Sequence, residues 1–249
     1  MASSAIPSLI RFADRQAMAS RVADLVAAAL RAGMVAPGNG EPGAVTQPAR
    51  LLVSGGSTPA ALYRELASRT LAWADVAVGL VDERWVPPSE DGSNETFVRE
   101  TLLTHKARAA SFIGMWHDDA TPLDAAADVA HRYTGFARSD CIILGMGNDG
   151  HTASWFPHAD GLDRALDDDA EAPLVTAVRA HESDITGAYL DRMTVTLKTV
   201  LGARLCILLL SGDEKKQVFE SALYPTSAAA MPVRALLAAR KDIWVCWAP

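Results

Sequence analysis

The sequence has 249 residues, of which 49% are hydrophobic and 21% are charged, and its formal net charge is −7. This composition is typical of a globular chain and excludes intrinsic disorder, and the acidic balance argues against nucleic acid or an anionic membrane as a partner. No run of 18 apolar residues is present, so we predict no membrane-spanning helix and expect a cytoplasmic protein.

The first predicted element is an amphipathic helix that ends near Gly33. Its apolar residues recur at intervals of three and four: Met18, Val22, Leu25, Val26 and Ala29. The next segment, residues 36–49, is rich in proline and glycine. We therefore expect a loop insertion there, within a single domain that covers residues 1–249.

Short apolar runs alternate with helical patterns along the rest of the chain. The runs predicted as strands are 51–54, 76–81, 112–116, 141–144, 174–178, 194–197, 205–210 and 243–247. The helical patterns between them cover 59–69, 95–103, 123–138, 214–223 and 233–239. This alternation predicts an α/β fold with a mostly parallel sheet, in which ligands bind at the carboxyl ends of the strands.

The first such strand end carries the segment Ser-Gly-Gly-Ser-Thr-Pro, residues 54–59. Gly55 and Gly56 allow a close backbone approach, Thr58 suits a helix N-cap, and Pro59 suits the first helical position. Free amides and the Ser57 and Thr58 hydroxyls at a helix start favour a phosphate site, although an ordinary strand-to-helix turn would use the same residues. A nucleotide P-loop is not indicated, because no Lys-Ser/Thr pair follows the glycines.

A charged segment, Asp82-Glu83-Arg84-Trp85, follows the second of these strands. Such a segment can be a solvated strand exit, but an arginine at this edge can also grip an anion through two hydrogen bonds. Ser93 and Asn94 nearby are predicted to cap the next helix.

The fourth predicted strand is followed by a glycine-rich loop that reaches Pro157. Its glycines fit the dinucleotide pattern G-x-G-x-x-G literally, but Asp149 would place a negative charge beside a pyrophosphate and Pro157 comes too early for a long crossover helix. We therefore interpret the segment as a loop that presents Asp149 and His151. An imidazole titrates near neutrality, and a carboxylate that orients it makes it a better general base.

Two further basic residues lie beside late strands. Arg192 directly precedes the apolar run 193–197. Lys215 follows the predicted strand 205–210, in the segment Gly212-x-x-Lys215. Either side chain can close over a phosphate, although surface lysines at helix starts are common. The remaining histidines show no metal-ligand spacing, so a metal site is not predicted.

Taken in order, these segments resemble the 6-phosphogluconolactonase family, which acts in the pentose phosphate pathway. The match covers 54–59, 82–84 with 93–94, 144–157, 192–197 and 212–215, and the loop at 145–157 is its most specific part. The resemblance implies a three-layer Rossmann-like domain related to glucosamine-6-phosphate deaminase and ribose-5-phosphate isomerase, with no metal or organic cofactor. It also implies a small-molecule sugar-phosphate lactone as partner; a monomer and a small homo-oligomer both stay open.

The resemblance further implies a division of roles. His151 would be the general base that activates water for attack on 6-phospho-D-glucono-1,5-lactone, with Asp149 beside it and loop amides or Arg84 as oxyanion donors. The substrate- and phosphate-binding residues would be Gly55, Gly56, Ser57, Thr58, Asp82, Arg84, Gly147, Arg192 and Lys215. Two alternatives are an amino-sugar-phosphate deaminase/isomerase, disfavoured because no glutamate follows His151 up to Pro157, and a non-catalytic sugar-phosphate sensor.

Overall fold

Two β-sheets organise the part of the chain that the computed structural model describes, residues 7–34, 47–118, 121–224 and 226–249. The large sheet is parallel throughout, in the order β1-β10-β9-β6-β2-β3-β5. Its strands are β1 (Leu9–Arg11), β2 (Ala49–Val53), β3 (Val76–Leu80), β5 (Ser111–Ile113), β6 (Cys141–Gly145), β9 (Leu205–Ser211) and β10 (Trp244–Ala248). The small antiparallel sheet, in the order β4-β8-β7, consists of β4 (Asp82–Arg84), β7 (Val175–Arg179) and β8 (Asp191–Val195).

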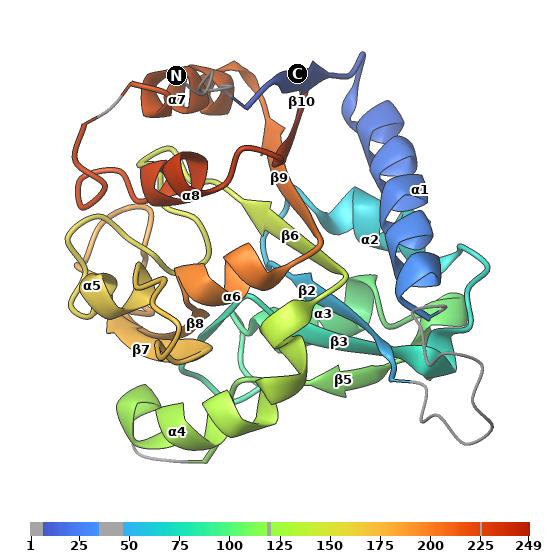
Figure 1. Ribbon diagram of the computed structural model, residues 1–249, viewed down its shortest axis with the longest axis horizontal. Coiled ribbons are helices and arrows are strands. Elements are labelled where there is room, and N and C mark those ends of the chain that lie inside the picture. Colours follow the sequence, from blue (N-terminus) through green and yellow to red (C-terminus); the bar gives the residue numbers. More distant parts are fainter. Residues whose placement is uncertain (1–6, 35–46, 119–120, 225) are drawn as a thin grey trace.

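Helices cover both faces of the large sheet, which gives the three layers predicted for this fold class. Helices α1 (Arg15–Met34) and α2 (Ala60–Ala67) lie on one side, and α6 (Leu197–Gly202) and α8 (Val233–Ala239) lie on the other (Figure 1). The remaining helices are α3 (Asn94–Thr101), α4 (Pro122–Arg132), α5 (Leu162–Ala165) and α7 (Asp213–Ala222), with short 3₁₀ turns at Trp73–Asp75, His105–Ala109 and Thr134–Arg138. Among the described residues, we find no helix with the length and apolar character needed to cross a membrane.

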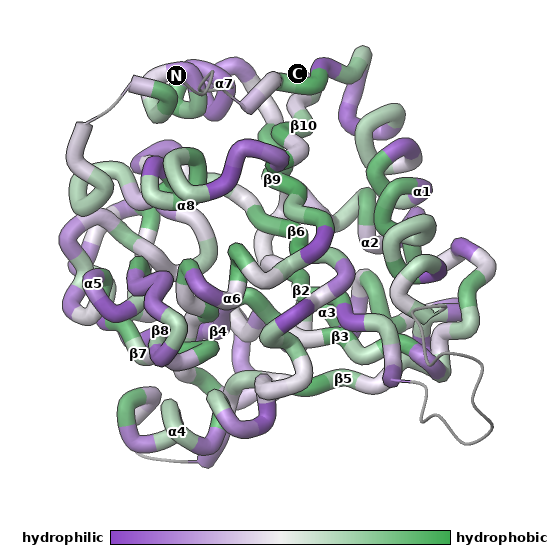
Figure 2. Tube along the Cα trace, viewed as in Figure 1, coloured by the Kyte–Doolittle hydropathy of each residue, from purple (hydrophilic) through white to green (hydrophobic). Residues whose placement is uncertain are grey.

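The core lies between the layers, and the strand sequences explain why. All five residues of β3 are buried, as expected for a strand that helices cover on both faces. Figure 2 shows hydrophobic residues concentrated along central strands such as β6 and β9. Cys141, Cys206 and Cys246 are buried free thiols on β6, β9 and β10, where they pack as small apolar side chains.

Several predicted elements differ from the structure. The runs at 174–178 and 194–197 form β7 and β8 of the small antiparallel sheet, and Leu197 already belongs to α6. Pro59 rather than Thr58 is the N-cap of α2, so the prediction for these two residues is wrong by one position. The pattern at 123–138 divides at Tyr133 into α4 and a 3₁₀ turn. Residues 36–46 of the predicted insertion at 36–49 lie outside the described residues, and at its end Ala49 already belongs to β2.

The position of the site follows from the strand order. Strands β2 and β6 are neighbours, but β2 leads into α2 on one face, whereas the chain leaving β6 leads towards α6 on the other face. Connections that diverge in this way leave a crevice at the carboxyl ends of the two strands, which is where open α/β sheets bind ligands.

Candidate active site

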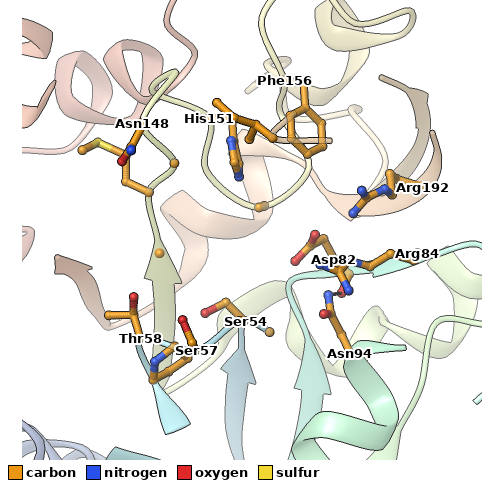
Figure 3. Close-up of a pocket in the computed structure, with 18 of the residues that line it drawn as sticks. Ser54, Ser57, Thr58, Asp82, Arg84, Asn94, Asn148, His151, Phe156 and Arg192 are labelled. Carbon is orange, nitrogen blue, oxygen red and sulfur yellow. Dashed lines mark hydrogen bonds between the residues drawn. The ribbon is translucent and has the colours of Figure 1, made fainter. Parts of the chain in front are cut away.

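A cavity of about 370 Å³ occupies the crevice above β2 and β6. Within the described residues, its walls come from the loops after these strands, from β4 and β8 of the small sheet, and from the start of α7 (Figure 3). The predicted residues that line it are Gly55, Gly56, Ser57, Thr58, Asp82, Arg84, Gly147, His151, Arg192 and Lys215. Segments distant in the sequence therefore meet at one concave site that contains both charged and apolar groups.

The serine–glycine loop, residues 54–59, forms one wall of this cavity. Gly56 has a φ of +92°, a left-handed conformation that favours glycine, and Thr58 Oγ1 lies 3.4 Å from Ser211 Oγ at the end of β9. A Cβ on Gly55 would lie 1.9 Å from Asn94 Oδ1, so glycine is required for the close packing of this loop against α3. Lys215 adds a cation whose pKa is lowered by burial and by the nearby Arg15.

His151 and Asp149 form a hydrogen-bonded pair on the loop after β6. The His151 Nδ1 lies 2.6 Å from Asp149 Oδ1, and the same oxygen accepts the His151 backbone N–H at 3.0 Å. Asp149 lies behind the imidazole and does not line the cavity. Burial raises the pKa of Asp149, but the hydrogen bonds and charge of His151 outweigh this effect and lower it overall, so the carboxylate stays ionised beside the ring.

The loop is shaped to make room for this imidazole. A Cβ on Gly147 would lie 2.2 Å from the His151 ring, so the ring occupies the space that a side chain would fill. The Gly147 N–H donates to His151 O and the Gly150 N–H donates to Gly147 O, at 2.9 and 3.0 Å. These two amides are therefore already used within the loop, so the other backbone amides of the loop and Arg84 remain of the predicted oxyanion donors.

Two arginines face each other across the small sheet. Arg84 on β4 pairs in register with Arg192 on β8. Arg192 is 3% exposed, and no carboxylate among the described residues forms an ion pair with it. Burial and the charge of Arg84 lower the pKa of Arg192 to about 10. Like charges opposite each other on paired strands repel, so this arrangement favours an anion between them.

Backbone carbonyls and an aromatic ring hold these guanidinium groups in place. Arg192 donates to Tyr189 O at 2.6 Å and to Thr186 O at 3.1 Å, and its guanidinium lies 5.3 Å from the centre of the Phe156 ring. The same ring lies 4.4 Å from the His151 ring. Phe156 thus packs between the candidate base and the cationic side of the cavity.

Glu83, between the two lining residues Asp82 and Arg84, anchors β4 from behind. Its carboxylate is fully buried and accepts hydrogen bonds from the backbone N–H groups of Arg84, Asn94 and Glu95 at 2.7–2.8 Å, and from Ser93 Oγ at 3.1 Å. These bonds join β4 to the start of α3, where Ser93 is the N-cap, as predicted. Burial raises the pKa of Glu83 to about 7. The hydrogen bonds from the backbone lower this pKa and the nearby Asp82 charge raises it, but burial is the largest effect.

This shift predicts a pH-dependent stability that Glu83→Gln removes. Because the folded-state pKa of Glu83 lies above its ordinary value of 4.5, ionisation destabilises the wild-type fold progressively as pH rises from 4.5 to about 7. The glutamine variant has no such ionisation, so the wild type should lose about 3 kcal/mol of unfolding free energy relative to it over this window. Urea unfolding at pH 4.5 and 7.5 measures this change, with the exposed Glu171→Gln as control. A variant-to-wild-type difference that does not depend on pH would contradict the prediction.

Asp149→Asn tests the charge behind the imidazole. Asparagine keeps an oxygen that can accept both hydrogen bonds from His151 but removes the negative charge, so we expect kcat to fall at least about tenfold, and by less than removal of the imidazole causes. The carboxylate also stabilises the fold above its ordinary pKa, a contribution that is lost as pH falls through the lowered folded-state value. Steady-state kinetics at neutral pH measure the first effect, with Asp168→Asn in an exposed loop as control. Unchanged kcat would exclude an electrostatic role for Asp149.

Several residues of the site were not predicted from the sequence. Ser54, Asn94, Asn148, Phe156 and Ile185 also line the cavity. Ser54 and Asn94 belong to segments that the sequence already marked, whereas Ile185 carries no local signal and reaches the cavity through the turn between β7 and β8. No group of three or more His, Cys, Asp or Glu side chains in the described part of the chain is placed to hold a metal ion.

Known proteins are similar to this chain over nearly its whole length. The model of the family described as glucosamine-6-phosphate isomerases/6-phosphogluconolactonase matches residues 13–247. A 6-phosphogluconolactonase of Rhizobium meliloti is 38% identical, over 96% of this chain and 97% of that protein. The crystal structure of a 6-phosphogluconolactonase from Shewanella baltica superposes with a TM-score of 0.86 at 36% identity and covers 98% of both chains. A monomeric glucosamine-6-phosphate deaminase shares the fold, with a TM-score of 0.76 at 16% identity over 97% of each chain.

Proposed function

This chain belongs to the glucosamine-6-phosphate isomerase/6-phosphogluconolactonase family, and we infer that it is a 6-phosphogluconolactonase. It hydrolyses 6-phospho-D-glucono-1,5-lactone to 6-phospho-D-gluconate. The observation that carries this inference is the placement of the His151–Asp149 pair in the same cavity as the opposed Arg84 and Arg192. A lactone hydrolase for a phosphorylated sugar needs both a base and an anion site, at a fixed separation.

We propose that His151 is the general base. Its neutral imidazole takes a proton from water as the water oxygen attacks C1, and Asp149 stabilises the imidazolium that forms. The unused backbone amides of the loop after β6 are the candidate donors to the resulting oxyanion, because Arg84 is assigned to the phosphate at the other end of the substrate. When the bond between C1 and the ring oxygen breaks, the imidazolium returns the proton to that oxygen, which leaves a hydroxyl group and a carboxylic acid that ionises at neutral pH.

The cationic groups would hold the phosphate. Arg84, Arg192 and Lys215 supply positive charge, and the loop of Gly55, Gly56, Ser57 and Thr58 supplies hydroxyl and amide donors. Asp82 and Gly147 complete the wall around the sugar. Because the phosphate anchors one end of the substrate, its binding energy is used to place C1 at His151.

We further propose that residues 1–249 act as one domain, since the site combines residues of both sheets.

A deaminase activity is a weaker candidate for the same fold. Among the lining residues of the described chain, Asp82 is the acidic one, and Ala153 lies on the wall beyond His151. Proton transfer between two substrate carbons requires additional carboxylates near the sugar. The similar deaminase is only 16% identical, which supports the shared fold and not a shared reaction.

A pH-stat assay with freshly generated lactone tests the proposed function. Acid release should exceed the spontaneous rate of hydrolysis in proportion to the protein concentration. A parallel incubation with glucosamine 6-phosphate, followed by an ammonia assay, should give no product. Acid release at the spontaneous rate would remove the lactonase assignment and favour a non-catalytic sugar-phosphate sensor, whereas ammonia release would favour the deaminase.

A further inference from the structure

The two opposed arginines have to be held in place against their mutual repulsion. Arg84 and Arg192 are direct neighbours on paired antiparallel strands, and both side chains lie on the same side of the cavity (Figure 3). Burial and the charge of Arg84 both lower the pKa of Arg192, as expected for two cations that lie close together. Long side chains relieve such repulsion by turning away from each other, so a site that uses both charges needs contacts that fix them.

Backbone carbonyls of two different loops provide these contacts. Arg84 donates to Gly92 O, in the loop between β4 and α3. Arg192 donates to Tyr189 O at 2.6 Å and to Thr186 O at 3.1 Å, in the turn between β7 and β8. The small sheet fixes the Cα atoms of the two arginines, whereas the ends of their side chains follow the loops. The separation of the guanidinium groups therefore depends on how the two loops are joined.

The side chain of Tyr189 joins them. Its hydroxyl donates to Asp91 O at 2.5 Å, across 98 residues of sequence. Its ring lies against Gly92, where an added Cβ would come within 2.6 Å of the ring and the φ is +98°. Tyr189 thus binds Arg192 through its own carbonyl, and through its ring and hydroxyl it contacts the segment whose carbonyl binds Arg84. One residue connects the supports of both guanidinium groups.

We propose that Tyr189 is a positioning residue of the anion site, which joins the two loops and so keeps the guanidinium groups of Arg84 and Arg192 directed at one phosphate group. Tyr189 is not among the described residues that line the cavity, so it acts through the arginines and not by contact with the ligand. The assignment rests on the proposed function for the identity of the anion as a sugar phosphate. It predicts that loss of the tyrosine hydroxyl weakens phosphate binding and leaves the chemical step unchanged.

The test is Tyr189→Phe, which keeps the ring against Gly92 and removes the hydrogen bond to Asp91. The Kd of inorganic phosphate and the Kd of 6-phosphogluconate, measured by calorimetry, should both rise about two- to fivefold, because the loss cannot exceed the free energy of one partly exposed hydrogen bond. KM for the lactone should rise by the same factor at unchanged kcat. The matched control is Tyr224→Phe, a tyrosine that is 71% exposed and does not line the cavity, and it should leave all these constants at wild-type values.

A double variant tests whether Tyr189 acts through the arginine pair. Arg192→Met leaves one guanidinium group, so there is no repulsion for the joined loops to oppose. In this background, Tyr189→Phe should raise the Kd of 6-phosphogluconate by a smaller factor than it does in the wild type. An equal factor in both backgrounds would mean that Tyr189 affects binding independently of the arginines, and would overturn the assignment.

Two results with the single variant would also overturn it. One is an unchanged Kd for both inorganic phosphate and 6-phosphogluconate, and the other is a fall in kcat at constant KM. Calorimetric binding does not require turnover, so these outcomes are separate from a failure of the lactonase function. If both Kd values rise as expected in a protein that does not hydrolyse the lactone, the positioning role stands and the proposed function alone is wrong.

Discussion

Replacement of His151 by alanine is expected to lower kcat for the phosphorylated lactone by about 10²–10⁴-fold, the usual contribution of a positioned general base. The imidazole faces the cavity with Asp149 behind it, and no other histidine lines the described wall. KM should change little, because the charged residues that would hold the phosphate lie on other elements. Steady-state kinetics, corrected for spontaneous hydrolysis, measure both constants.

His131→Ala provides the matched control for this variant. His131 is exposed in the last turn of α4 and does not line the cavity, so its removal should leave kcat and KM at wild-type values. If His151→Ala instead retained near-normal turnover while its fold was intact, His151 would not be the base, and water would have to be activated by another group.

Arg192→Met is expected to raise KM for the phosphorylated lactone by about 10- to 150-fold, the range for loss of a charge-assisted hydrogen bond. Methionine retains much of the side-chain bulk beside Phe156 but loses the positive charge. Arg192 is buried without an acidic partner among the described residues, so its charge is available to a bound anion. Unphosphorylated glucono-1,5-lactone should show little change in kcat/KM, because it has no phosphate to lose.

The control for this prediction is Arg179→Met. Arg179 is an exposed arginine on β7 that pairs with Asp191 at 2.6 Å, away from the cavity. It should leave KM unaltered for both lactones. An equal loss for phosphorylated and unphosphorylated substrates in Arg192→Met would mean that this arginine shapes the site or contacts the sugar, and that another group binds the phosphate.

The parallel sheet could be predicted from the sequence because its signal is local. Runs such as 76–81 and 205–210 are apolar on both faces. This pattern is typical of a strand that other elements cover on both sides. The small sheet could not be separated from it, because β7 and β8 have similar apolar runs and their pairing partner is set by tertiary contacts. Strand β4 has three charged residues, Asp82–Arg84, and its extended form depends on β8 and on the bonds to Glu83.

Part of the candidate site could likewise be predicted from local sequence, and part of it depends on tertiary contacts. Glycine, hydroxyl and histidine residues identified its two main loops, because they directly follow predicted strands, at the sheet edge where such folds bind ligands. The register that opposes Arg84 to Arg192 could not be inferred from either segment alone. The contact of Phe156 with both His151 and Arg192 likewise depends on how distant segments pack.

The opposed guanidinium groups have a practical consequence for any measurement on this protein. Two like charges held together in a recess attract small dianions without regard to the rest of the molecule that carries them. Sulfate or phosphate in a buffer would therefore compete with substrate and inflate an apparent Michaelis constant. The order of buffers by inhibitory strength should follow anion charge, and this dependence should weaken when either arginine is neutralised.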